Sequence, residues 1–359
     1  MFRNPIKKIL FSATTLIAVV SLVLAGCGDD NDSEGASSDE KPLIVVTTNI
    51  LGDVVTNMVG DSFDVETIMP PGSDPHDFQA SAQQVQTMMS ADLLIVNGAN
   101  FEEGMLDVIE NAESDGVMIF EATSVISQLE GSDDHSDHGG HDDHDDHEGH
   151  DDHDEEKDHH DHEGHDHDEE KDHDDHEGHD HGGIDPHFFT DPARMAIVAQ
   201  ELSEFLAANF PDADQGFVST ANDYVQQLQD LDSEVEETLS VISSDKRLLV
   251  TNHGVFAYFA DRYSFTILGE IIPSSSTLAS ASAQQLASLA EEIKESQVKA
   301  IFADASSSDA LAQTLSDEVN DVKVINLYTE SLGDPGSSGD SYIDMIRFNA
   351  EAIASALVE

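Results

Sequence analysis

The fold is indicated most clearly by one stretch of the sequence, 248-LLVTNHGVFAYFADRYSFTILGEI-271. Its first residues, Leu248–Thr251, form a short apolar run that predicts a buried strand. Val255–Tyr263 has the length and composition of a helix, and Phe265–Ile271 predicts a second strand. A strand, a helix and a strand in close succession predict two parallel strands joined by a right-handed crossover.

The same alternation runs through the rest of the chain after Pro42. Further strands are expected at Leu43–Thr48, Val65–Met69, Leu93–Asn97, Val117–Phe120, Val298–Ala303 and Val322–Leu327. Helices are expected at Leu51–Val59, Ala82–Ser90, Met105–Asn111, Ala283–Glu295, Ala310–Val319 and Tyr342–Val358. The pattern predicts an α/β protein with two (β/α)4 lobes, each built on a parallel sheet.

A long helix is expected to join the two lobes. Pro192 stands behind the potential cap Asp191, which predicts a helix that runs to about Asn209. From about Gly216 to Ile242, apolar residues then recur at helical spacing without a turn signal. About 25 helical residues span about 38 Å, which suits a rigid strut between lobes. The predicted boundaries are 42–210 for the first lobe, 211–243 for the connecting helix and 244–359 for the second lobe with the closing helix.

The N-terminus has the features of a targeting segment. Arg3, Lys7 and Lys8 precede the apolar run Ile9–Leu24, which ends in Leu24-Ala25-Gly26-Cys27. This ending resembles a bacterial lipobox, so residues 1–26 are expected to be a signal peptide and Cys27 to carry lipid. Residues 27–41 are then a flexible tether. Cys27 is the only cysteine, which excludes an intramolecular disulfide and a cysteine-ligated zinc site.

The charge balance restricts the class of partner. The formal net charge is −61, and only part of it comes from residues 131–183, which hold 25 acidic residues and two lysines. Acidity is therefore general. It excludes nucleic acid, whose binding requires Lys and Arg, and it argues against electrostatic binding to anionic lipid. A strongly acidic surface instead accumulates cations.

A tract from Asp133 to His181 contains 16 of the 19 histidines. No apolar residue occurs from His135 to Gly183, so this loop is expected to be disordered. An acidic spacer would not need histidine, and imidazole with carboxylate binds transition metals weakly and with poor selectivity when no thiolate is present. The accessory metal contacts predicted here are His135, His138, His141, His144, His147, His150, His153, His159, His160, His162, His165, His167, His173, His176, His179 and His181.

The three histidines outside the tract are better candidates for a defined site. His76 and His253 each follow a predicted strand, and Asp304 directly follows Val298–Ala303. In open parallel sheets, ligands bind beyond the carboxyl ends of the strands. His187 stands in Asp185-Pro186-His187, which repeats the tripeptide that ends at His76. Three imidazoles and one carboxylate, drawn from both lobes, suit a tetrahedral zinc ion in the cleft and leave no position for a catalytic water.

Five stretches resemble the metal-binding lipoproteins that serve as solute receptors of zinc and manganese ABC importers. They are GSDPHDF (72–78), DPHFFTDP (185–192), NHGVFAYFADRY (252–263), IFAD (301–304) and YIDMIRFN (342–349). The resemblance implies two (β/α)4 lobes, a rigid connecting helix and an ion in the interlobe cleft. By motif position, it implies the ligands His76, His187, His253 and Asp304.

The resemblance also bears on the metal. Zinc-type members carry a His/Asp-rich loop before the second ligand, and manganese members tend to have Glu at the third, where this chain has His253. Two departures from the family are Phe78-Gln79-Ala80 after the first ligand and Phe188-Phe189-Thr190 after the second. Aromatic character is kept at both. After the first ligand the family often has Tyr-Glu-Pro, and this chain has Gln79 in place of that Glu, so the hydrogen bonds of the Glu are not expected here.

The expected function is that of an extracytoplasmic substrate-binding lipoprotein, lipid-anchored through Cys27 to the bacterial membrane. It would capture one tightly bound Zn²⁺, deliver it to a membrane permease, act as a monomer and catalyse no reaction. Three alternatives stay open. The chain is a manganese or iron receptor of the same family, an extracellular metal buffer or adhesin that works through the tract, or a metallohydrolase with Glu270 as its base.

Overall fold

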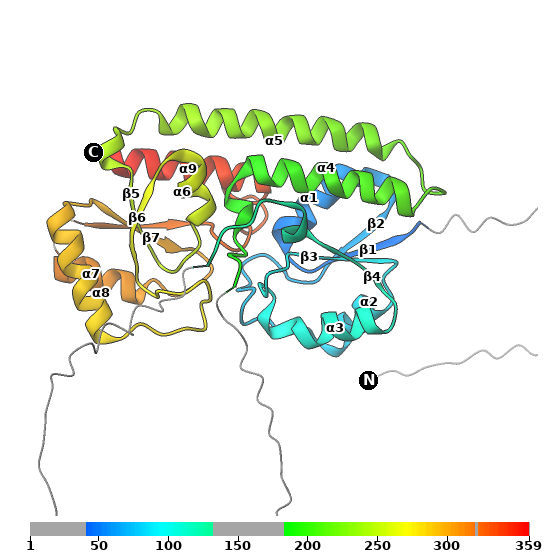
Figure 1. The fold of residues 1–359 in the computed structure, drawn as a ribbon, viewed down its shortest axis with the longest axis horizontal. Coiled ribbons are helices and arrows are strands. Elements are labelled where there is room, and N and C mark those ends of the chain that lie inside the picture. The colour runs from blue at the N-terminus through cyan, green and yellow to red at the C-terminus, as the bar shows by residue number, and fades with distance from the viewer. Residues whose placement is uncertain (1–40, 132–182, 320–321, 359) are drawn as a thin grey trace, which may run out of the picture. The chain divides into compact units, whose positions relative to one another are not determined.

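The structure is a computed structural model that describes residues 41–131, 183–319 and 322–358 (Figure 1). The predicted signal peptide, most of the tether with Cys27, and the histidines of the tract lie outside the described residues. The described residues from Lys41 onward belong to one compact unit. Among the described residues, no helix combines the length and the apolar composition needed to cross a bilayer.

Two four-stranded parallel sheets form the framework, as the sequence predicts. The first has the order β2 (Asp64–Thr67), β1 (Leu43–Val46), β3 (Leu93–Val96), β4 (Met118–Glu121). The second repeats this order with β6 (Thr266–Glu270), β5 (Leu248–Thr251), β7 (Ala300–Asp304), β8 (Lys323–Leu327). In each sheet the first strand in the chain pairs on both sides. The strand order therefore reverses direction next to β1 and next to β5. Such a reversal creates a ligand-binding crevice at the carboxyl ends of the strands.

The central strands β1, β3, β5 and β7 are buried on both faces, which explains their continuous apolar runs. Along β1, Ile44 and Val46 join the core beneath the long helices, whereas Val45 joins a separate core on the opposite face. In Figure 1, α2 (Ala82–Met89) and α3 (Leu106–Ser114) lie on that opposite face of the first sheet. In the second lobe, α7 (Ala283–Ser296) and α8 (Ala310–Val319) take the equivalent place.

Local capping chemistry sets several helix starts. Ser81 caps the N-terminus of α2 and Ser282 that of α7, and each forms a capping box with the Gln three residues later. Thr48 caps α1 (Asn49–Val59) through its hydroxyl. The remaining helix of the second lobe, α6 (Ala257–Tyr263), ends at Ser264 in the left-handed conformation. Short 3-10 turns occur at Gly60–Ser62, Glu103–Met105, Ala122–Val125, Phe188–Thr190 and Ser244–Lys246.

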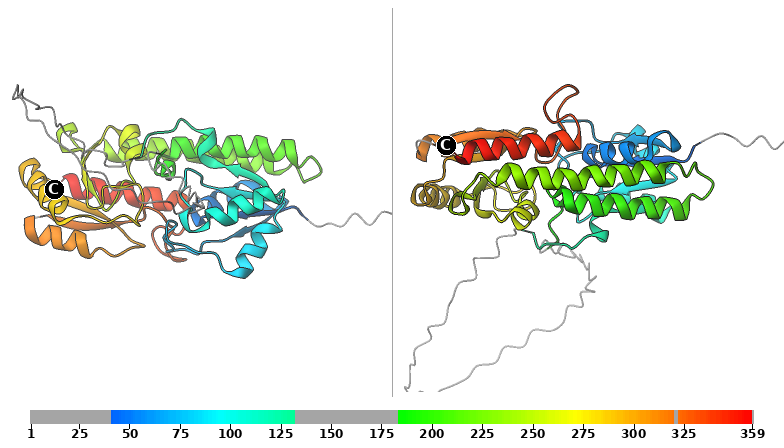
Figure 2. Two further views of the ribbon diagram at one scale, coloured as in Figure 1. Left: turned by 60° about the horizontal axis from the view of Figure 1, so that its bottom comes forward. Right: turned by 90° about the horizontal axis from the view of Figure 1, so that it is seen from above.

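Three longer helices form a layer that joins the lobes. They are α4 (Pro192–Asn209), α5 (Phe217–Leu239) and α9 (Tyr342–Val358), and Figure 2 shows them side by side. Asp191 caps α4 as predicted, because its carboxylate accepts from Ala193 N at 2.8 Å. The connecting helix α5 is slightly shorter than predicted. It packs against α1, α4 and α9 through one apolar stripe, Phe217, Ala221, Tyr224, Leu228, Leu231, Val235 and Leu239.

A polar contact ties α5 to the second lobe. Asp232 on α5 accepts from Arg262 Nε at 2.8 Å and from the Tyr263 hydroxyl at 3.0 Å. Replacement of Asp232 by Ala leaves both donors without their acceptor. We expect it to lower the free energy of unfolding by about 1–3 kcal/mol, measured by urea denaturation. The matched control is Asp230→Ala, an exposed carboxylate on the same helix, with an expected change within about 0.5 kcal/mol. Equal midpoints for the two variants would show that Asp232 does not stabilise this junction.

Candidate metal centre

The three histidines predicted from the sequence come together between the lobes. Their Nε2 atoms surround one carboxylate oxygen, Glu330 Oε1, at 3.0 Å for His76, 2.9 Å for His253 and 3.4 Å for His187. One ligand atom from each of these four residues lies within 4.8 Å of the others. All four side chains are buried, with exposed fractions of 2% or less. Three imidazole nitrogens and a carboxylate oxygen form a suitable ligand set for a divalent transition metal.

Asp304, the fourth ligand expected from the sequence, lies nearby but is engaged elsewhere. It is the last residue of β7, and its carboxylate accepts hydrogen bonds from Ser306 and from the Thr329 hydroxyl. Burial and the neighbouring Glu330 raise the pKa of Asp304 to about 6. The geometry therefore offers Glu330 in the place where the sequence suggested Asp304. Glu330 follows β8 as Asp304 ends β7, so the same argument from strand ends applied to both.

The two Asp-Pro-His tripeptides share one backbone arrangement. Asp74 Oδ1 accepts from His76 N at 3.0 Å, and Asp185 Oδ1 accepts from His187 N at 2.8 Å. Each carboxylate thus holds the backbone across the intervening proline, whose φ angle is fixed. The repeated tripeptide is a rigid turn that presents an imidazole.

The imidazole rings differ in what supports their other nitrogen. His187 Nδ1 lies 2.7 Å from Asp185 Oδ1, and His76 Nδ1 lies 3.0 Å from Glu103 Oε1. A carboxylate at Nδ1 favours the tautomer with its proton there, which leaves Nε2 as a metal ligand. His253 Nδ1 has no hydrogen-bond partner among the described residues. Sequence reasoning did not find Glu103, because it follows no strand end and belongs to no motif quoted above.

The segment before His187 is held from both lobes. Asn97, just after β3, donates from Nδ2 to Pro186 O at 2.9 Å. The Tyr258 hydroxyl on α6 donates to Asp185 O at 2.9 Å. Glu102 supports Asn97 in turn, because its carboxylate accepts from the backbone N of Asn97 at 2.7 Å, and burial raises the pKa of Glu102. His187 is thereby positioned by the ends of strands and helices in both lobes.

Glu330 belongs to the second lobe by sequence but is fastened to the first. Asn49, at the start of α1, donates to Ser331 Oγ at 2.8 Å and accepts from Leu332 N at 2.8 Å. Gly72 N, in the loop that carries His76, also donates to Ser331 Oγ at 2.8 Å. The segment after β8 is therefore a bridge, and it places Glu330 at equal reach of histidines from both lobes.

Neighbouring charges in the cluster shift the pKa values of His76 and Glu330. Burial opposes the charged form of His76, but the carboxylates of Glu330 and Glu103 raise the pKa of His76 to about 10. Burial likewise opposes ionisation of Glu330, while His253 and His76 hold the pKa of Glu330 well below its usual range. The centre is thus a buried carboxylate, Glu330, that attracts positive charge to the imidazoles around it. A divalent cation satisfies the same electrostatic requirement after displacing the protons.

A cavity of about 550 Å³ opens beside His76. It is lined by His76 and Glu103 and by Gly131 and Gly183, the described ends that flank the histidine-rich tract. These ends are joined, because Gly131 N donates to Gly183 O at 2.9 Å and Glu130 forms an antiparallel bridge with Ile184. The described residues on either side of the tract therefore lie at this cavity.

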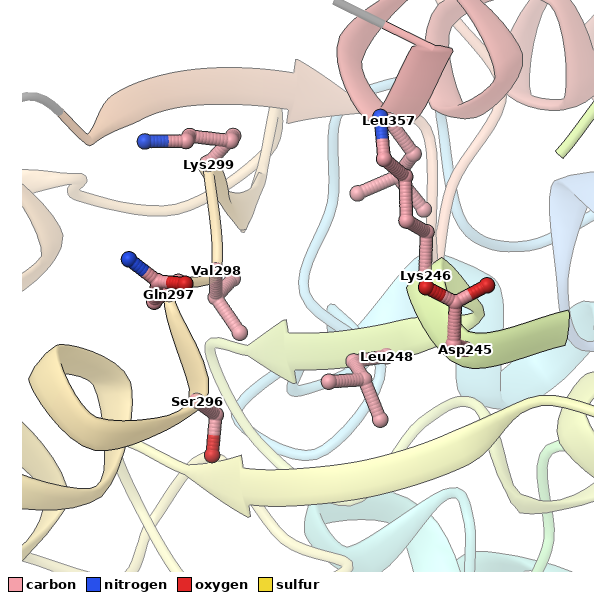
Figure 3. Close-up of a pocket in the computed structure, with 8 residues that line it drawn as sticks. All are labelled: Asp245, Lys246, Leu248, Ser296, Gln297, Val298, Lys299 and Leu357. Atoms are coloured by element: carbon pink, nitrogen blue, oxygen red, sulfur yellow. The ribbon is translucent and has the colours of Figure 1, made fainter. Parts of the chain in front are cut away.

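A second cavity, of about 280 Å³, lies at the opposite end of the second sheet (Figure 3). Its lining includes Lys246, Leu248 and Lys299, at the amino ends of β5 and β7. His253 follows the carboxyl end of β5, so this cavity is separate from the histidine cluster.

Curated proteins similar to this chain are metal-receptor lipoproteins. The manganese ABC transporter substrate-binding lipoprotein PsaA of Streptococcus anginosus is 26% identical over 98% of this chain and 99% of its own length. The manganese-binding lipoprotein MntA of Halalkalibacterium halodurans is 25% identical over 98% of this chain and 99% of its own length.

Solved structures share the two-lobe fold. The periplasmic zinc-binding protein TroA from Treponema pallidum matches with a TM-score of 0.69 and 24% identity, over 89% of this chain and all of that chain. A manganese-bound periplasmic metal-binding protein from Candidatus Liberibacter asiaticus matches with a TM-score of 0.68 and 20% identity, over 88% of this chain and all of that chain. At these identities, the matches establish the fold.

The family model described as "zinc-uptake complex component A, periplasmic" matches residues 44–356, which include both sheets, the helical layer and all four residues of the buried cluster. With this match across nearly the whole folded unit, the chain belongs to the ZnuA family of periplasmic zinc-uptake components.

Proposed function

We propose that this protein captures Zn²⁺ in the cleft between its lobes and delivers it to a membrane permease. The observation that carries the proposal is the convergence of His76, His187, His253 and Glu330, all buried, within one coordination sphere. The cluster draws ligands from both lobes, so separation of the lobes would dismantle the site. A receptor that must release its ion needs such a site.

The coarser part of this function follows from family membership. The chain is the substrate-binding component of a metal ABC importer, and it is not an enzyme. The proposed ligand set agrees with this role, because four protein ligands leave a tetrahedral ion no open position for a catalytic water.

The choice of zinc rests on the chemistry of the ligands. Three neutral imidazoles and one carboxylate suit zinc, whereas manganese prefers more oxygen ligands. The curated relatives PsaA and MntA are named for manganese, and this favours a manganese receptor as the second candidate. His253 is the residue on which the choice depends, because a carboxylate there would shift the ligand set towards oxygen.

The remaining features are proposed from the sequence. Residues 1–26 are a signal peptide, Cys27 carries the lipid that anchors the protein outside the cytoplasm, and residues up to 41 are a tether. The lobes extend over 42–210 and 244–359 with the connecting helix between them, and the protein acts as a monomer. The tract gathers additional, weakly bound ions near the mouth of the cleft.

The first test separates the cleft from the tract. In a chain lacking Asp133–His181, calorimetry is expected to find one tightly bound Zn²⁺ per chain and fewer weak ions. A further His187→Ala change is expected to abolish the tight ion. Loss of all tight binding on deletion of the tract alone would favour an extracellular metal buffer instead.

The second test distinguishes Glu330 from Asp304. Glu330→Ala removes a proposed ligand, so we expect Zn²⁺ affinity to fall by more than about 100-fold, beyond the usual effect of a supporting residue. Asp304→Asn keeps the shape of a side chain that only supports the site, and we expect a loss of about tenfold. Competition with a chromophoric chelator measures both, and a larger loss in Asp304→Asn would return Asp304 to the ligand set.

The third test concerns metal choice. His253→Glu replaces an imidazole with a carboxylate, and we expect the ratio of Mn²⁺ to Zn²⁺ affinity to rise by about tenfold. His253→Asn is the control, because it removes the imidazole without adding a carboxylate. An unchanged ratio in His253→Glu would mean that this position does not select the metal.

A further inference from the structure

We propose that Glu103 is the residue through which the cation reaches the buried cluster, as the first carboxylate that it meets within the described lining of the cavity and as the positioning residue of His76. This inference rests on the proposed function and adds a route and a residue that the ligand set does not contain. It is carried by the exposure of Glu103, by its contact with His76 and by its rigid backbone setting.

Glu103 differs from the buried cluster in its access to solvent. Its side chain is 31% exposed, whereas those of His76 and Glu330 are 2% and 0% exposed. Among the described residues that line the cavity at the mouth, Glu103 is the only one with a carboxylate. A cation that enters through this cavity therefore meets Glu103 before it meets the imidazole of His76.

Glu103 supports Nδ1 of His76, whereas Nδ1 of His187 is supported by the aspartate of its own Asp-Pro-His tripeptide. At His187, the carboxylate of Asp185 supports both the backbone and Nδ1. At His76, the equivalent Asp74 supports the backbone with Oδ1, but its Oδ2 accepts from the Thr277 hydroxyl of the second lobe at 2.8 Å. Glu103 therefore provides the support for His76 Nδ1. This carboxylate is partly exposed to solvent, whereas Asp185, which supports His187 Nδ1, is 1% exposed.

The backbone holds Glu103 firmly in this place. Gly98, Ala99 and Asn100 all have positive φ angles, of 88°, 51° and 58°, and form a tight turn just before it. A Cβ added to Gly104 would lie 2.3 Å from Phe78 O, so the chain after Glu103 is pressed against the loop that carries His76. A carboxylate held this way supports the imidazole at a fixed distance and needs no rearrangement to meet an ion.

The chemistry of transfer follows from this geometry. A carboxylate in a cleft attracts a hydrated cation and raises its local concentration. The same carboxylate accepts a hydrogen bond from Nδ1–H of His76, which keeps the proton on Nδ1 and leaves the lone pair of Nε2 directed towards the buried cluster. Glu103 therefore affects both arrival of the ion and its retention, and the two effects are separable by substitution. Glu103→Gln removes the charge but keeps an acceptor for Nδ1, whereas Glu103→Ala removes both.

The test follows Co²⁺ binding to the full chain by stopped-flow absorbance. Four-coordinate Co²⁺ absorbs visible light far more strongly than Co²⁺ in octahedral sites, so the signal reports the cluster. We expect Glu103→Gln to slow association about tenfold at low salt, with a smaller difference at high salt, because screening weakens the attraction. Its dissociation rate is expected to stay at the wild-type value. Glu103→Ala is expected to dissociate about tenfold faster in addition.

The matched control is Glu110→Gln, which removes an exposed carboxylate from α3 outside the cavity lining and is expected to leave both rates unchanged. Wild-type association in Glu103→Gln, or the same loss in Glu110→Gln, would overturn the role in arrival. Equal dissociation rates in the Gln and Ala variants would overturn the positioning role. Absence of the strong visible band in the wild-type protein would instead contradict the proposed function itself, so the two failures are distinguishable.

Discussion

The organisation of this protein depends on one buried carboxylate oxygen, Glu330 Oε1, which faces the Nε2 atoms of three histidines. A buried carboxylate is costly unless positive charge or hydrogen-bond donors surround it, and three imidazoles supply them here. His76 comes from the first lobe and His253 from the second. The need to satisfy Glu330 therefore favours the arrangement in which both lobes meet around it.

Hydrogen bonds outside the cluster fix the positions of Glu330 and His187 relative to both lobes. The bridge after β8 is fastened to α1 through Asn49, and the turn that carries His187 is held by Asn97 of one lobe and Tyr258 of the other. Behind the cleft, α5 packs on helices of the first lobe and on α9. Polar contacts close to the cluster thus set distances within it, while apolar packing of the helical layer keeps the two sheets together.

This division suits a receptor that binds one ion and later releases it. The contacts at the cleft are a limited number of hydrogen bonds, such as that between Asp74 and Thr277, which are weaker than the continuous apolar packing of the helices. Membership of a periplasmic zinc-uptake family agrees with a metal site that can be reached from the cavity beside His76. The described flanks of the histidine-rich tract lie at that mouth, beside the partly exposed Glu103.

Much of the fold was determined locally and could be predicted from the sequence by itself. Four-residue apolar runs such as Leu248–Thr251 become buried parallel strands, and caps such as Asp191 set helix starts, because both depend on neighbouring residues. His76 and His253 followed from the rule that parallel sheets bind ligands at their carboxyl ends, and His187 followed from the repeated Asp-Pro-His tripeptide. The fourth position did not, since β7 and β8 are adjacent, β7 ends at Asp304 and Glu330 comes three residues after β8. Only the tertiary structure shows how their surroundings differ, and this difference is the basis for proposing Glu330. Asp304 is still paired within the sheet and bonded to Ser306 and Thr329, whereas Glu330 lies beyond β8 on a segment fastened across the cleft. The direction of a side chain and the reach of a loop depend on contacts between residues far apart in the chain. For the same reason, the role of Glu103 could be inferred only from its contact with His76 in the folded structure.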